Sequence, residues 1–79
     1  MSNLEKYNQS FIESLVIKKD LLNDKLKYQS VPEWDSIGHM TLIAALEESF
    51  GFTMETNDIV DFSSYKKGMK ILNKYKVDI

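Results

Sequence analysis

The chain has 79 residues, of which 43% are hydrophobic and 28% are charged, the proportions of one small globular domain spanning residues 1–79. No apolar run approaches the roughly 18 residues that a membrane-spanning helix needs, and the N-terminus is polar, so we expect a cytoplasmic monomer without stable membrane insertion. Cysteine and arginine are absent and there is one histidine, which excludes disulfides and two-histidine or thiolate metal sites and argues against a nucleic-acid partner.

The first predicted element is an amphipathic helix near the N-terminus. Apolar residues recur there at spacings of three and four, which is typical of the buried face of a helix. They are Leu4, Tyr7, Phe11 and Leu15. Ser2 or Asn3 can cap the N-terminus of this helix.

A long connection is predicted after the first helix. Leu21, Leu22 and Leu26 indicate an apolar turn or two that anchors this connection. Pro32, the only proline, favours extended geometry at Val31, so no helix should cross this point.

The second predicted helix covers residues 35–50. Asp35 is suited to cap its N-terminus, and Gly51 supplies a C-terminal stop. Its apolar residues fall into two groups. The group expected to face the core is Leu42, Ile43, Leu46 and Phe50. The other group either forms a second, partly exposed ridge or packs into the core as well, and it consists of Ile37, Met40 and Ala44.

Two further helices are predicted in the last third of the chain. A short one covers residues 57–61, capped by Thr56, and buries Ile59 and Phe62. A longer one is capped by Ser63 or Ser64 and runs to about residue 75. Its inward residues are Tyr65, Met69 and Leu72. The predicted fold is therefore all-α, a small four-helix bundle of three longer helices and one short helix, with a long loop between the first two.

Charge is distributed unevenly along the chain, whose net charge is −2. Residues 31–61 hold seven acidic residues and no lysine, whereas residues 62–79 hold five lysines and one aspartate. The middle third is either a surface that attracts a basic partner or a solvated acidic face.

The residues with chemical potential lie where the second helix begins. Ser36 follows the predicted cap Asp35, with its hydroxyl outward at the positive end of the helix dipole, a place that favours an anion. No Gly-x-Ser-x-Gly elbow surrounds Ser36, and His39 is the sole candidate base, without an evident orienting partner. We therefore expect no catalytic residues and no enzymatic activity, and we expect His39 to be a packing residue.

The segment Trp-Asp-Ser-Ile-Gly-His-Met stands at residues 34–40, and Leu-Glu-Glu-Ser-Phe-Gly-Phe follows at 46–52. Together these segments resemble the acyl carrier protein family, whose Asp-Ser-Leu motif is matched by Asp35-Ser36-Ile37. The similarity covers residues 4–73, including the first helix, the long loop and the start of the last helix.

This resemblance implies a carrier protein with an acyl-carrier-like fold. A phosphopantetheinyl transferase would attach 4′-phosphopantetheine from coenzyme A to Ser36, with Asp35 as helix cap and transferase recognition residue. The thiol of the arm would hold an acyl group as a thioester. A loading ligase and acyltransferase or synthase enzymes would dock on the second helix, whose contact residues would be Ile37, Met40, Ala44, Glu47 and Glu48.

Two departures from the family pattern bear on the pathway. Gly38 and Thr41 stand where carriers of fatty-acid synthesis usually place acids, which favours a specialised pathway for lipid, surface-polysaccharide or secondary-metabolite assembly. Gly68 either opens space for an acyl chain between the second and fourth helices or is a tolerated weak spot. An aminoacyl or peptidyl carrier with the same arm, and an unmodified helical interaction module, remain alternatives.

Overall fold

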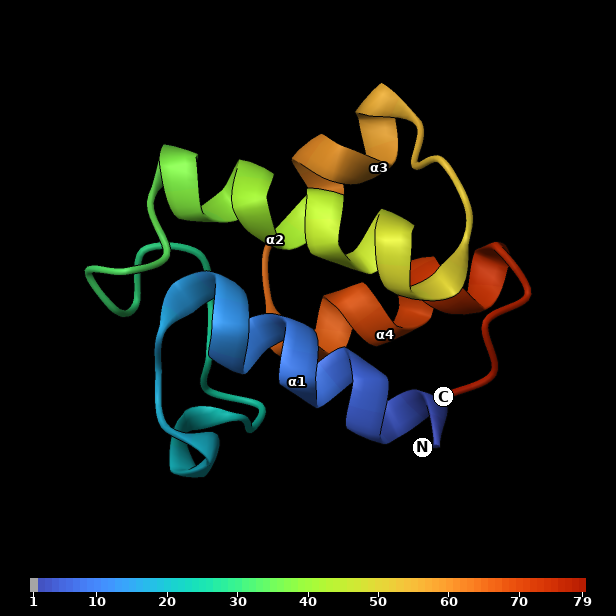
Figure 1. Ribbon diagram of the computed structural model, residues 1–79. Coiled ribbons are helices and arrows are strands. Elements are labelled where there is room, and N and C mark those ends of the chain that lie inside the picture. The colour runs from blue at the N-terminus through green and yellow to red at the C-terminus, as the bar shows by residue number, and fades with distance from the viewer. Residues whose placement is uncertain (1) are drawn as a thin grey trace.

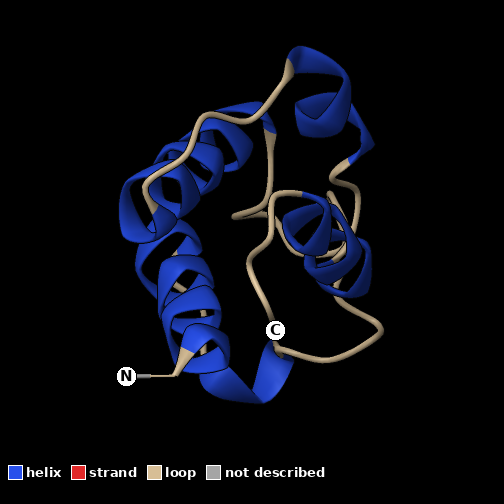
Figure 2. Cartoon of the chain, turned by 90° about the vertical axis from the view of Figure 1, so that its right-hand side faces the viewer, coloured by secondary structure: helices blue, strands red, loops and turns tan. Residues whose placement is uncertain are grey.

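Figure 1 shows a computed structural model of the protein, which describes residues 2–79. Its helices are α1 (Asn3–Leu15), α2 (Ser36–Phe50), α3 (Thr56–Asp61) and α4 (Tyr65–Lys74), and a turn of 3-10 helix spans Lys19–Leu21. Across residues 2–79 these helices are joined by loops and no strand is formed (Figure 2). The predicted all-α class, with three longer helices and one short one, is confirmed as a small helical bundle.

The helix α1 forms because a capping residue precedes it and apolar residues line one of its faces. The Ser2 side chain accepts a hydrogen bond from the Glu5 backbone N–H, and the Glu5 carboxylate accepts one from Ser2, which completes a capping box. Tyr7, Phe11 and Leu15 are buried as predicted, whereas Leu4 is 43% exposed in the first turn. The buried face therefore begins one turn later than the sequence pattern predicts.

The helix α2 runs antiparallel to α1 (Figure 1). The start of α2 meets the end of α1, since a methyl group on Gly38 would touch the Leu15 side chain. The other end of α2 returns to the start of α1, where the Lys6 amine lies 5.8 Å from the centre of the Phe50 ring. In α2, the residues Leu42, Ile43 and Leu46 are buried in the core, as predicted.

The long loop between α1 and α2 is tied to the start of α4 by backbone hydrogen bonds. The Tyr28 N–H donates to the Ser63 carbonyl, and the Tyr65 N–H donates to the Leu26 carbonyl, both at 2.9 Å. Leu26 is buried and anchors the loop as predicted, whereas Leu21 is 40% exposed. These hydrogen bonds hold the loop in place beside the start of α2.

The starts of α3 and α4 differ in how well the sequence predicts them. Ser64 caps α4, because its Oγ accepts a hydrogen bond from the Lys67 N–H at 2.9 Å. The predicted cap of α3, Thr56, is wrong: Thr56 is its first helical residue, and the preceding Glu55 takes the cap position without a side-chain hydrogen bond. The Glu55 backbone carbonyl accepts the first helical hydrogen bonds, from Asp58 and Ile59, so the backbone alone starts α3.

Neither predicted interpretation of Gly68 holds in the structure. Gly68 is buried, and a Cβ there would overlap the ring of Phe62 and the hydroxyl of Tyr7, both of which are buried. That hydroxyl donates a hydrogen bond of 2.6 Å to the Tyr65 carbonyl, which holds the ring in place. Glycine is therefore required by close packing, and no space for an acyl chain opens at this position.

Candidate functional site

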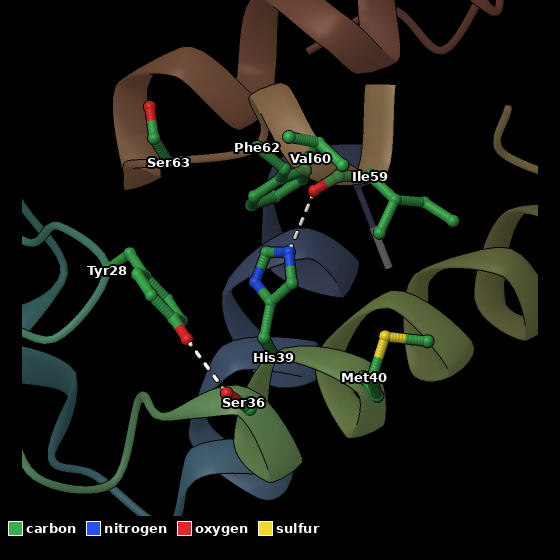
Figure 3. A pocket seen from close by; sticks show the side chains of 8 residues that line it. All are labelled: Tyr28, Ser36, His39, Met40, Ile59, Val60, Phe62 and Ser63. Atoms are coloured by element: carbon green, nitrogen blue, oxygen red, sulfur yellow. Dashed lines mark hydrogen bonds between the residues drawn. The ribbon is translucent and has the colours of Figure 1, made fainter. Parts of the chain in front are cut away.

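Ser36 is the first residue of α2, and its side chain is exposed. Its Oγ lies 3.2 Å from the hydroxyl of Tyr28, which reaches across from the long loop (Figure 3). The predicted cap Asp35 is confirmed, because its Oδ1 accepts a hydrogen bond of 2.8 Å from the Gly38 N–H. The same residue's carbonyl accepts the first helical bond, from the His39 N–H. The Ser36 hydroxyl is thus held at a well-formed helix start, open to solvent.

The Tyr28 side chain is held from several sides, although nothing in the sequence predicted it as a site residue. Its ring stands edge-on to Trp34 and His39, with centroid separations of 6.3 and 5.5 Å. The next residue, Gln29, has a left-handed backbone (φ 65°), and its N–H donates to the Trp34 carbonyl at 2.9 Å. No local pattern in the sequence pairs Tyr28 with Ser36, because the contact depends on how the loop folds back.

His39 lies one turn along α2 and uses both ring nitrogens away from Ser36. Its Nδ1 accepts a hydrogen bond of 3.0 Å from the Trp34 indole N–H, which is a donor only. The Nε2 must then carry the proton that it donates to the Ile59 carbonyl, at 2.8 Å (Figure 3). His39 therefore joins the loop, α2 and α3, which agrees with its predicted role in packing, and neither of its ring nitrogens is directed at Ser36.

An open pocket of about 340 Å³ lies between the start of α2 and α3, with Ser36 on its wall (Figure 3). Most of its lining is apolar or aromatic. The lining residues are Tyr28, Ser36, His39, Met40, Ile59, Val60, Phe62 and Ser63. A small apolar group attached near Ser36 would find a surface to rest on here.

The predicted ridge of α2 is exposed rather than packed in the core. Ile37 is 79% and Met40 56% exposed, and Ala44 is exposed as well. Val60 on α3, which lines the pocket together with Met40, is 75% exposed. We call these four residues the outer apolar face. Three of them lie on α2 and one on α3, and two of them, Met40 and Val60, line the pocket beside Ser36.

The two glutamates predicted to contact partners lie in different environments. The Glu47 side chain is half-buried, and its Oε2 accepts a hydrogen bond of 2.8 Å from the Met54 N–H, which fixes the loop after α2. Glu48 is exposed. Glu48 is thus the one of the pair whose charge faces solvent, while Glu47 has a structural bond in addition to any contact with a partner.

A charged cluster holds α3 against α4. Asp58 is buried, and its carboxylate accepts hydrogen bonds from the Lys74 amine, at 2.7 Å, and from the Tyr75 hydroxyl. The Lys74 bond, with that of Tyr75, keeps the pKa of Asp58 below its usual value, and the Asp58 bond raises the pKa of Lys74. Among residues 2–79 no group of three or more His, Asp and Glu side chains is arranged to bind a metal.

Comparisons of the chain with protein families, with curated proteins and with solved structures found no match. Within the described part, none of the helices has both the length and the apolar character needed to cross a membrane.

Proposed function

We propose that the protein is a carrier protein with an acyl-carrier-like fold, which bears 4′-phosphopantetheine on Ser36 and presents the arm's cargo to partner enzymes. The observation that carries the proposal is the exposed Ser36 hydroxyl at the first residue of α2, on the wall of an apolar pocket. Modification suits this serine better than hydrolysis, because His39 commits both ring nitrogens to Trp34 and Ile59.

The Ser36 oxygen acts as the nucleophile in the modification. It forms a bond to the phosphorus that carries the pantetheine of coenzyme A, the diphosphate bond at that phosphorus breaks, and adenosine 3′,5′-bisphosphate leaves. The serine proton passes to a base of the transferase. The attached arm supplies a terminal thiol for thioester formation, a group that this cysteine-free chain does not have.

We infer that partner enzymes contact the outer apolar face. Ile37 and Ala44 share one side of α2, and Met40 borders the pocket opposite Val60, so an enzyme that covers this face also covers the region beside Ser36. Glu48 on the same helix would steer a basic partner toward this face.

Intact mass after incubation with coenzyme A and a broad-specificity phosphopantetheinyl transferase tests the proposal. We expect the wild type and Ser63→Ala to gain one phosphopantetheinyl group and Ser36→Ala to gain none. Ser63 is the matched control, because it is another exposed serine at the same pocket. An unmodified wild type beside a labelled control carrier would refute the proposal and favour an unmodified interaction module.

The cargo is tested separately, by mass spectrometry of the modified protein after co-expression with candidate ligases. A gain in mass by an acyl group supports the acyl carrier, and a gain by an amino acid would make the protein an aminoacyl carrier with the same arm. We favour acyl cargo of a specialised lipid, polysaccharide or secondary-metabolite pathway, because the first half of α2 lacks acidic residues.

A further inference from the structure

The contact between Tyr28 and Ser36 joins two hydroxyl groups, only one of which would survive the proposed modification. In the unmodified chain either hydroxyl can donate across the 3.2 Å separation. Once the Ser36 oxygen becomes part of an ester, it has no hydrogen left to donate. The Tyr28 hydroxyl is then a donor that faces the attachment point of an anionic group.

The position of the Tyr28 hydroxyl is set by the fold. The Tyr28 N–H is bonded to the Ser63 carbonyl, and the ring is half-buried and stands edge-on to Trp34 and His39. Because these three contacts come from the loop, from α2 and from the residues before α4, the hydroxyl has little freedom to turn away from Ser36. Figure 3 shows the Tyr28 hydroxyl directed at Ser36.

We propose that Tyr28 is a positioning residue for the arm, whose hydroxyl donates a hydrogen bond to a phosphoryl oxygen of the phosphodiester on Ser36. This inference rests on the proposed function. Hydrogen bonds to a charged acceptor are about twice as strong as neutral ones, so the modified chain gains a stronger bond than the one it loses.

A hydrogen bond from Tyr28 would determine where the arm lies when no partner enzyme is bound. Tyr28 lies on the pocket side of Ser36, where His39 and Met40 also line the wall. Ile37, the exposed neighbour of Ser36, points to solvent and does not line the pocket. A phosphodiester bonded to Tyr28 therefore directs the first part of the arm over the pocket, toward Met40 and Val60. The other two residues of the outer apolar face, Ile37 and Ala44, do not line the pocket and stay free for an approaching enzyme.

The ³¹P NMR signal of the phosphodiester in the modified protein tests this inference. We expect the modified Tyr28→Phe protein to show a ³¹P chemical shift displaced from that of the modified wild type by more than the linewidth, with a narrower line, because the phosphate moves more freely. Tyr65→Phe is the matched control. It also removes a phenol hydrogen bond, to Asn8, but the Tyr65 side chain does not line this pocket, and its ³¹P signal should match the wild type.

The outcomes separate the two proposals. An unmodified wild type refutes the carrier function itself. Modified proteins with identical ³¹P shifts and linewidths refute the role of Tyr28 and leave the carrier function standing. If Tyr28→Phe does not fold, the wild type labelled with ¹³C at tyrosine Cζ gives the answer, since modification should shift the Tyr28 signal and leave that of Tyr7 unchanged; an unmoved Tyr28 signal would also refute its role.

Discussion

Replacing His39 with alanine removes the side chain that links three parts of the site. The ring accepts the Trp34 indole hydrogen at 3.0 Å and donates to the Ile59 carbonyl at 2.8 Å. It also packs against the rings of Tyr28 and Phe62, with centroid separations of 5.5 and 6.0 Å. The loop, α2 and α3 all lose a contact at once, so we expect a large loss of stability from a residue that is not itself fully buried.

The magnitude follows from the groups left unpaired. Trp34 is completely buried, and a buried donor without an acceptor costs about 1–3 kcal/mol. Loss of the bond to the half-buried Ile59 adds about 0.5–1.5 kcal/mol. A chain of 79 residues is typically stable by about 4–12 kcal/mol, so His39→Ala should remove a large share of the free energy of unfolding. A loss of about 3 kcal/mol corresponds to a fall in melting temperature of about 12–24 °C.

Urea denaturation of a double-mutant cycle measures the contribution of the Trp34 bond. Trp34→Phe also removes the donor, so it should cost about 1–2 kcal/mol less in the His39→Ala background than in the wild type. Thr41→Ala is the control, because Thr41 is an exposed residue of α2 whose loss should change the free energy of unfolding by less than about 0.5 kcal/mol.

The proposed role of His39 is refuted if His39→Ala is as stable as the control, or if the effects of the His39 and Trp34 substitutions simply add. The first result would mean that the Trp34 hydrogen finds another partner, and the second that the two side chains do not depend on each other. The first would remove His39 as a connection between the loop, α2 and α3, and the second would remove its link to Trp34 in the loop.

Three further substitutions test other parts of the molecule. Gly68→Ala should lower the free energy of unfolding in urea by about 1–3 kcal/mol, because the new methyl group overlaps buried side chains; wild-type stability would show that this part of the core has room. Asp58→Asn should lower the melting temperature at neutral pH. Since Lys74 lowers the pKa of Asp58, the ionised form stabilises the fold above the ordinary value of 3.8, and the difference should shrink as the pH falls below it; a constant difference would contradict this. Glu48→Lys should slow modification of Ser36 severalfold at low salt and less at high salt, and unchanged kinetics at low salt would place Glu48 outside the interface.

The start and end of α2 could be predicted from the sequence because their signals are local. Asp35 caps the helix through a bond three residues away, and Gly51 ends it with a left-handed backbone (φ 67°) that glycine adopts readily. The exposure of Ser36 follows from the same boundary, since the first residue of a helix capped in this way projects from its end. The main features of the candidate site were therefore predictable without a structure.

Features that depend on distant residues could not be predicted in this way. Tyr28 meets Ser36 only because hydrogen bonds from the loop to the start of α4 fold the loop back across α2. Gly68 is a weak helix former in the sequence, and only the positions of Tyr7 and Phe62 show why no larger residue fits. Thr56 has the chemistry of a helix cap, yet the backbone at Glu55 starts α3 one residue earlier.

The glycine at position 38 shows how packing affects the proposed partner surface. A Cβ on Gly38 would fall on the carbonyl oxygen of Glu33, so the turn before α2 excludes every larger residue, including the acid that carriers of fatty-acid synthesis usually have nearby. The absence of an acid at position 38 is thus explained by the close approach of the loop to α2, without any reference to a partner; the exposed Thr41 is not constrained in this way. The effect on partners remains: the surface next to Ser36 presents Ile37 and Met40, and Glu48 lies three turns further along α2. If the proposed carrier function holds, we therefore expect a partner enzyme to meet Ser36 with apolar contacts and to place its basic residues toward the far end of α2.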